Sequence, residues 1–328
     1  MTERVLVTGI TGYIGQHCGA ELFRQGYEVV GTARSESKAE STRSALGEVG
    51  PADKLTLVEA DLLSDDGWDE AVTGCTYVLH VASPFVFAEP TDENELIAPA
   101  VEGTTRVIAA AQRAGVKRFV LTSSVAAVSA GKSSGRYGPE SWSDSDAKIG
   151  TYSKSKTLAE RAAWKLNEDN DMELVAINPG AVLGPSLGAA IDGQSVTMMS
   201  DMIAGKMPMV PDLAFGMVDV RDVARLHVAS MTADGAAGKR FIAASTEPAE
   251  MIDLAKTLKD AGYDKVSIRK APTILMKLMG LFNSEVKGMV PSLGKRVSLD
   301  NSATFDVLKW EPTPVEDSVL EMAVALSK

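Results

Sequence analysis

The chain has 328 residues, of which 45% are hydrophobic and 23% charged, and its mean hydropathy is +0.01. This length suffices for one large domain or two modest ones, and the composition is that of a globular protein. No apolar run approaches the roughly 20 residues that a membrane-spanning helix needs, so we expect no membrane partner. The formal net charge of −11 argues against a nucleic-acid partner, because phosphate binding requires a basic face.

Neither cysteines nor histidines indicate a metal site. Cys18 and Cys75 are too few and too far apart for a metal site or a disulfide framework, and we expect buried thiols. His17, His80 and His227 show no metal-ligand spacing. The first residues lead directly into a predicted strand and leave no room for a signal peptide, so a cytoplasmic location is expected.

Residues 5–15 join a short apolar run to Gly9, Gly12 and Gly15, which are three residues apart. The run predicts a strand buried on both faces, and the glycines allow a tight turn and close approach of a ligand. The helical pattern over 16–25 follows, and the free N–H groups of a helix start favour a pyrophosphate. A glycine triplet alone is a weak signal, and an ordinary strand-to-helix turn is the alternative. Its position predicts a dinucleotide site, in which we expect contacts from Gly9, Thr11, Gly12, Tyr13 and Ile14.

The first half of the chain alternates strands and helices. Strands are predicted at 4–8, 28–32, 55–59, 76–82, 117–122 and 173–178. This alternation predicts an α/β fold, a doubly wound parallel (Rossmann) sheet with helices on both faces and a ligand crevice at the carboxyl ends of its strands. The alternation breaks after about residue 180, which predicts a smaller C-terminal α/β substrate domain. The dinucleotide-binding domain is expected to comprise 1–180 and about 214–247, and the substrate domain about 181–213 and 248–328.

Three local expectations concern less regular segments. Residues 129–149 lack periodicity and predict a long surface loop. Pro99 lies inside a helical pattern over 93–113 and predicts a separate first turn or a kink. A strand is predicted at 266–269.

The residues that follow the second, third and fourth strands are candidate cofactor contacts. Arg34 occupies the place where an NAD-binding protein usually carries an acidic residue, and with Lys38 it favours the 2′-phosphate of NADPH. Solvated surface cations are the alternative for both residues. Asp61 and Leu62 are expected near the adenine, and further contacts are expected from Val81, Ala82 and Ser83.

Tyr152 and Lys156 are four residues apart at the head of a predicted helix, so both project from one face. A phenol with a pKa near 10 is a poor acid or base at neutral pH unless a nearby cation stabilises its phenolate, and Lys156 is placed to lower the pKa of Tyr152. A serine hydroxyl from the end of the fifth strand would hold the substrate oxygen. The pair alone is common in helices; it points to catalysis because of the preceding glycine turn and strand pattern.

These features resemble the extended short-chain dehydrogenase/reductases. The resemblance is closest to the group of dihydroflavonol reductases, cinnamoyl-CoA reductases and NADPH-dependent carbonyl (aldehyde) reductases, and it runs over nearly the full length. The matching segments are TGITGYIG (8–15), HVASP (80–84), PAVEGT (99–104), LTSS (121–124), ESWSD (140–144), YSKSKTLAE (152–160), NPG (178–180), VDVRDVA (218–224) and DNS (300–302).

The resemblance implies roles for individual residues. Ser124, the second of two adjacent serines, matches the catalytic position, Tyr152 matches the proton donor, and Lys156 matches the residue that binds the nicotinamide ribose. Pro179 and Val182 match positions that flank the nicotinamide. We further expect cofactor contacts from Thr122, Tyr152, Lys156 and Gly180, and substrate contacts from Ser83, Phe85, Ser124, Val125, Tyr152, Met198, Met199 and Met202. For the three methionines, ordinary core packing is the alternative.

Two departures from the family pattern narrow the expected activity. Ala100 stands where many extended members carry an asparagine, which argues against an asparagine-based proton relay. Ser129 stands at a position where flavonoid reductases are similar to one another in carrying an asparagine that recognises the substrate. The serine therefore argues against a flavonoid substrate.

The function expected from this resemblance is NADPH-dependent reduction of a small-molecule ketone or aldehyde by a monomer or homodimer. An epimerase, dehydratase or hydroxysteroid dehydrogenase of the same superfamily is the alternative, and a catalytically silent dinucleotide sensor is a third. The presence of Ser124, Tyr152 and Lys156 argues against the sensor.

Overall fold

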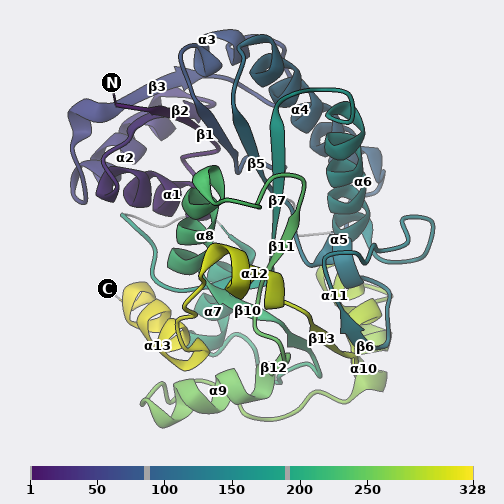
Figure 1. Ribbon diagram of the computed structural model, residues 1–328. Helices are drawn as coiled ribbons and strands as arrows, with labels where there is room; N and C mark the ends of the chain where they lie inside the picture. The colour runs from purple at the N-terminus through teal and green to yellow at the C-terminus, as the bar shows by residue number, and fades with distance from the viewer. Residues whose placement is uncertain (1, 85–88, 189–192, 328) are drawn as a thin grey trace.

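A computed structural model describes residues 2–84, 89–188 and 193–327 (Figure 1). Its centre is a seven-stranded sheet in the order β11-β7-β5-β4-β1-β2-β3, with every neighbouring pair parallel. The strands are β1 (Arg4–Thr8), β2 (Glu28–Ala33), β3 (Leu55–Glu59), β4 (Tyr77–His80), β5 (Arg118–Thr122), β7 (Glu173–Pro179) and β11 (Arg240–Ala243). The predicted parallel sheet is therefore confirmed. The strand order reverses between β1 and β4, where a doubly wound sheet opens its ligand crevice.

Helices cover both faces of this sheet, because successive side chains of each strand point to opposite faces. Val5 and Val7 belong to one core cluster, together with α1 (Tyr13–Arg24), α2 (Glu36–Gly47) and α8 (Val220–Thr232). Leu6 belongs to a second cluster, with α3 (Trp68–Val72), α4 (Asn94–Arg113) and α6 (Thr151–Leu166). Figure 1 shows α4 and α6 side by side on the face opposite α1 and α8.

A third core cluster lies beyond the carboxyl edge of the sheet. It contains buried side chains of α7 (Gln194–Ile203), α9 (Met251–Asp260) and α13 (Val315–Leu326). The remaining helices are α5 (Ala126–Ser129), α10 (Thr273–Met279), α11 (Ser284–Met289) and α12 (Ser302–Leu308), with 3₁₀ turns at Ala52–Lys54 and Val290–Ser292. The remaining strands form three pairs: β8 (Ala181–Leu183) with β10 (Met217–Asp219), β9 (Ala214–Phe215) with β12 (Ala249–Glu250), and β6 (Ser134–Tyr137) with β13 (Arg296–Leu299).

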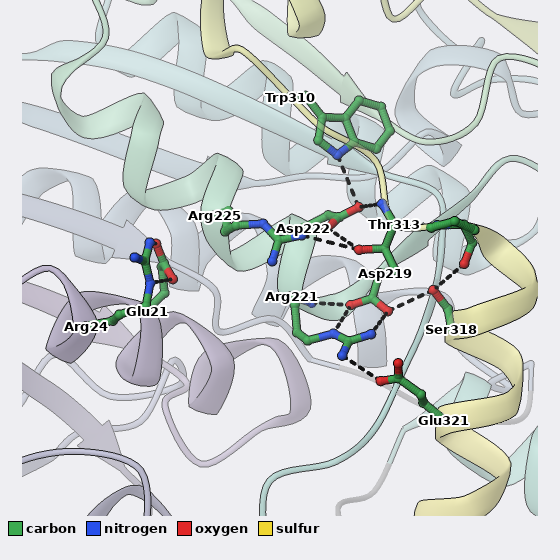
Figure 2. Close-up of polar contacts among 11 residues, drawn as sticks. Glu21, Arg24, Asp219, Arg221, Asp222, Arg225, Trp310, Thr313, Ser318 and Glu321 are labelled. Atoms are coloured by element: carbon green, nitrogen blue, oxygen red, sulfur yellow. Dashed lines mark hydrogen bonds and ion pairs between the residues drawn. The ribbon is translucent and has the colours of Figure 1, made fainter.

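Two carboxylates at the start of α8 hold the C-terminal segment (Figure 2). Asp219 accepts hydrogen bonds from the Arg221 side chain and from Ser318 Oγ (2.8 Å). Asp222 accepts from Trp310 Nε1 (3.2 Å), from the amide (2.7 Å) and hydroxyl (2.9 Å) of Thr313, and from Arg225. Both aspartates are buried, so the first turn of α8 is the anchor of residues 310–318.

Three local predictions need correction. The expected surface loop at 129–149 contains β6, which pairs in parallel with β13, more than 150 residues later in the chain. The expected strand at 266–269 is an extended segment with an isolated bridge between Val210 and Lys270. Of the two alternatives given for Pro99, the separate first turn is wrong, because α4 is one helix from Asn94 to Arg113 with Pro99 inside it. The N–H that Pro99 lacks would have served the carbonyl of Glu95, an exposed residue whose carbonyl water can reach.

No helix in the described ranges is long and apolar enough to cross a bilayer.

Candidate active site

The glycine turn after β1 is shaped by close backbone contacts. Gly9 has a φ of +66°, and a Cβ atom there would lie 2.8 Å from Ala82 Cα. A Cβ on Gly15 would lie 2.2 Å from the carbonyl oxygen of Gly9, so any side chain there would collide with the turn. α1 begins directly after Gly12, without a side-chain cap and without an acidic residue in its first turn. The helix start therefore keeps backbone donors for an anion.

Tyr13 and His17 tie α1 to the segment that follows β8. The Tyr13 hydroxyl donates to the carbonyl oxygen of Gly184 (2.6 Å), and His17 Nε2 bonds to that of Pro185 (2.9 Å). Burial lowers the pKa of His17 to about 4, so the ring is neutral at pH 7 and Nε2–H is the donor. The hydroxyl of Tyr13 therefore donates its hydrogen bond within the protein.

Arg34 and Lys38 lie at the carboxyl end of β2. Arg34 follows the last residue of that strand, and Lys38 lies in the first turn of α2, which Ser35 caps. Both side chains are exposed, and neither makes a hydrogen bond or an ion pair with any other residue that the structure describes. This leaves two cations available to a phosphate at the edge of the crevice.

The other predicted cofactor contacts lie after β3 and β4. Asp61 accepts a hydrogen bond from the amide of Leu63 (2.8 Å), which fixes the turn, and Leu62 packs against α4. The Ala82 amide donates to Thr8 Oγ1 (3.1 Å), which holds the start of the segment containing Val81 and Ser83 beside the glycine turn. Phe85, the predicted substrate contact, lies outside the described residues.

Ser124, Tyr152 and Lys156 meet at the carboxyl end of β5. Ser124 follows the strand by two residues and is buried, while Tyr152 and Lys156 lie on the first two turns of α6. The Ser124 hydroxyl lies close enough to the Tyr152 phenol to lower its pKa. Lys156 Nζ donates to the carbonyl oxygen of Thr122 (3.4 Å). Residues from a strand end and from a helix thus converge, as the i, i+4 spacing of the helix pair indicates.

The protonation states of this group suit proton donation. Burial raises the pKa of Tyr152, although the residue as a whole is 36% exposed, and the Ser124 hydroxyl opposes this rise. Tyr152 is therefore protonated at neutral pH. Burial lowers the pKa of Lys156 to about 8, and the Glu160 carboxylate opposes this shift. We expected Lys156 to lower the pKa of Tyr152; in the structure the lowering comes from Ser124.

Residues predicted at the nicotinamide and substrate positions lie on neighbouring backbone. The Val125 amide donates to the carbonyl oxygen of Pro179 (2.9 Å), and a Cβ on Gly180 would lie 2.0 Å from the carbonyl oxygen of Gly216. Val182 lies in β8, which pairs with β10. The hydroxyl of Thr122 is engaged by His227 Nε2 (2.7 Å), which leaves the backbone of Thr122 for other contacts.

Met199 and Met202 are buried in the third core cluster, and Met198 packs against it while partly exposed. The structure therefore places Met199 and Met202 in core packing, the alternative to an open pocket.

A buried polar network below the catalytic group was not predicted. Glu160 accepts hydrogen bonds from Ser123 Oγ (2.5 Å), Asn178 Nδ2 (2.9 Å) and Arg240 Nε (2.6 Å). The signal in the sequence was the position of Glu160 eight residues after Tyr152 and four after Lys156, on the same helical face.

The head of α6 carries a second unpredicted contact. Its N-cap, Gly150, has no side chain, and the Glu89 carboxylate accepts from both the amide (3.0 Å) and the hydroxyl (2.5 Å) of Thr151. Lys154 Nζ pairs with Glu93 (2.6 Å). Through Glu89, the segment that follows β4 is thereby bound to Thr151, the residue that precedes Tyr152.

Comparison with known proteins shows the family of the chain. The family model described as "NAD dependent epimerase/dehydratase family" matches residues 5–244. Cinnamoyl-CoA reductase CAD2 of Medicago truncatula is 36% identical over 246 residues, which cover 73% of this chain and 75% of that protein. Dihydroflavonol 4-reductase of Hordeum vulgare is 37% identical over 204 residues, 60% of this chain and 58% of that protein. The crystal structure of yeast methylglyoxal/isovaleraldehyde reductase Gre2 complexed with NADPH has a TM-score of 0.81 at 25% identity, covering 98% of each chain.

The family model spans most of the sheet and every residue of the catalytic group, and the seven parallel strands carry them in the expected order. The chain therefore belongs to the NAD dependent epimerase/dehydratase family, the extended short-chain dehydrogenase/reductases.

Proposed function

We propose that this protein reduces a ketone or aldehyde to an alcohol with NADPH, and that Tyr152 donates the proton to the carbonyl oxygen. The observation that carries the proposal is the convergence of Ser124, Tyr152 and Lys156 at the carboxyl edge of the sheet. The raised pKa of Tyr152 keeps the phenol protonated until the oxygen of the substrate needs its proton. Ser124 holds that oxygen by a hydrogen bond.

The residues around the glycine turn fit a dinucleotide phosphate. A side chain at Gly9 or Gly15 would collide with backbone, which fits a turn reserved for close approach, and the start of α1 supplies N–H donors. Arg34 and Lys38, whose side chains bind no other described residue, suit a 2′-phosphate, and Lys156 would bind the ribose. The cofactor, when bound, supplies the hydride. The similar yeast protein Gre2 is a methylglyoxal/isovaleraldehyde reductase complexed with NADPH, which supports this choice of cofactor and of aldehydes as a substrate class.

The test is NADPH oxidation over a panel of aromatic aldehydes, keto esters, diketones and one dihydroflavonol. Wild type is expected to oxidise NADPH with at least one carbonyl, and Tyr152→Phe to lose turnover by about 10²- to 10⁴-fold, the usual contribution of a positioned proton donor. NADPH affinity, measured by fluorescence titration, is expected to stay within about twofold because the variant keeps the ring. Loss of NADPH binding together with turnover would contradict the role given to Tyr152.

The family description favours one alternative, an epimerase or dehydratase that retains its cofactor. That alternative predicts NAD copurifying with the protein and no turnover of free carbonyl compounds. A purified protein free of nucleotide that oxidises NADPH would exclude it.

A further inference from the structure

Glu160 is a buried carboxylate at the centre of the catalytic segments. Its side chain is 0% exposed and accepts hydrogen bonds from four residues, Ser123, Trp164, Asn178 and Arg240. Ser123 immediately precedes Ser124, and Asn178 Nδ2 also donates to the carbonyl oxygen of Ser124 (3.1 Å). One carboxylate therefore restrains the backbone of Ser124 from two sides.

Arg240 extends this network to a further segment. Its guanidinium pairs with Glu160 through Nε (2.6 Å) and Nη2 (3.1 Å), while Nη1 donates to the carbonyl oxygens of Pro139 (2.7 Å) and Ser141 (2.6 Å). The ring of Trp142 covers the guanidinium at 3.8 Å. The pair thus joins α6, the ends of β5 and β7, the start of β11 and residues 139–142.

Stability alone does not explain this choice of residues. A buried ion pair pays desolvation on both partners, and apolar side chains of similar volume often stabilise a core as well or better. What apolar side chains would not reproduce is the charge, and Glu160 lies one helical turn from Lys156 on the same face.

The charged and titratable groups around Lys156 come from three elements. Tyr152 and Glu160 share α6 with it, His80 faces it from β4, and Arg240 stands behind Glu160 on β11. His80 is neutral at pH 7, because burial and then the charge of Lys156 lower its pKa to about 3. Tyr152 is protonated and uncharged at this pH. Glu160 is the acidic group that opposes the effect of burial on Lys156.

We propose that Glu160, held by Arg240, is a positioning residue of the reaction: it fixes Ser124 against α6 and is the buried counter-charge that keeps the Lys156 ammonium protonated. The kinetic part of this inference rests on the proposed carbonyl reduction. The electrostatic part is testable without turnover.

The variants separate charge from packing. Glu160→Gln removes the anion and leaves Arg240 unpaired. The double variant Glu160→Met/Arg240→Met refills the site with apolar side chains, as buried ion pairs often allow without loss of the fold. Arg161→Met is the matched control, since Arg161 follows Glu160 on α6 and also lies over the Trp142 ring (5.2 Å).

The first readout is the titration of Lys156 by NMR of protein labelled at lysine Cε, with Lys156→Met to assign the resonance. Wild type is expected to titrate near 8. The midpoint should fall by about one pH unit in the double variant, and further in Glu160→Gln, where the charge of Arg240 remains. Arg161→Met should titrate as wild type. An unchanged midpoint in a folded double variant would overturn the counter-charge, whatever the substrate is.

The second readout is kinetic. The folded double variant is expected to lose about 10- to 100-fold in kcat with little change in KM for NADPH, and the basic limb of its pH profile should move to lower pH with the Lys156 midpoint. Wild-type kcat and pH profile in that variant would reduce Glu160 to a packing role. A wild-type protein without turnover would instead refute the proposed function and leave the NMR result to decide the counter-charge.

Discussion

At the scale of single residues, we propose that the charge of Arg34 decides the choice of cofactor. The Arg34 guanidinium, which no other described residue engages, can offer charged hydrogen bonds to a 2′-phosphate. Such bonds are worth about 1.5–3 kcal/mol each, or roughly 10- to 100-fold in affinity. NADH has a hydroxyl at that place and offers no such partner. The preference for NADPH should therefore reside in this side chain.

Arg34→Ala is expected to weaken NADPH binding about 10- to 100-fold and to leave NADH binding within about twofold. Isothermal titration with both nucleotides measures this. Arg43→Ala is the control, because Arg43 lies on the nearby helix α2 but is paired with Glu40. Equal weakening of both nucleotides would mean that Arg34 does not contact the phosphate.

At this scale the sequence predicted Ser124, Tyr152 and Lys156 as the candidate catalytic residues, but it did not predict the buried Glu160 beneath them. Tyr152 and Lys156 were predicted from helical spacing; the end of a strand predicted a serine, and the family resemblance indicated Ser124. Glu160 carries the same spacing, yet a glutamate on a helix is normally solvated, and its burial depends on Arg240, 80 residues later. A partner so distant in the sequence leaves no local pattern.

At the scale of elements, helix α6, which carries Tyr152 and Lys156, depends on a cap from another segment. Gly150 has a φ of +82° and no side chain, so the first turn of α6 lacks the local acceptor that serine or aspartate usually supplies. Glu89 fills this role, and its negative charge also suits the positive end of the helix dipole.

Glu89→Ala is expected to cost about 1–2 kcal/mol of unfolding free energy, the usual loss for a helix cap, measured by urea denaturation. Hydrogen exchange should quicken for the amide of Thr151, which donates to Glu89 in the structure. Glu89→Gln keeps an acceptor oxygen and should lie in between. Glu95→Ala, an exposed acid in the first turn of α4, serves as the control. Unchanged exchange at Thr151 in Glu89→Ala would refute the cap.

Helices and strands could be predicted where their burial produces a regular pattern of apolar residues in the sequence. All six strands expected in the first half were found. Most strands of the central sheet are buried on both faces and appear as apolar runs, whereas the edge strand β3 is partly exposed and mixes polar with apolar residues. β6 reads Ser-Gly-Arg-Tyr, is largely exposed, and exists because β13 lies beside it. β6 is therefore a strand because of its tertiary contact with β13, and its own residues do not predict a strand.

At the scale of the whole molecule, we propose that the chain divides as its sequence pattern indicates, with residues about 214–247 returning to the dinucleotide-binding part. α8 lies in that returning stretch and packs on α1, whereas α13 contributes to the third core cluster. The carboxylates of Asp219 and Asp222 then join the two parts, because their partners Trp310, Thr313 and Ser318 belong to the C-terminal segment.

Asp219→Asn tests this junction. Burial acts to raise the pKa of Asp219, but hydrogen bonds from Arg221, from Ser318 and from the Arg221 amide outweigh it and hold the pKa below 3.8. A pKa lowered in the folded state stabilises the fold above the unfolded value and is lost as pH falls through the folded one. The variant should therefore lose about 2–3 kcal/mol of unfolding free energy at pH 7, the worth of charged hydrogen bonds. The difference from wild type should shrink below pH 3.8.

The control for this junction is Glu321→Gln, which removes the exposed partner of the same arginine. An exposed pair contributes at most about 1 kcal/mol, so this variant should stay close to wild type at both pH values. Chemical denaturation at neutral and acid pH measures both variants. If Asp219→Asn loses the same unfolding free energy at every pH, the carboxylate acts through its shape and not its charge. The proposed ionic link between α8 and the C-terminal segment would then be wrong.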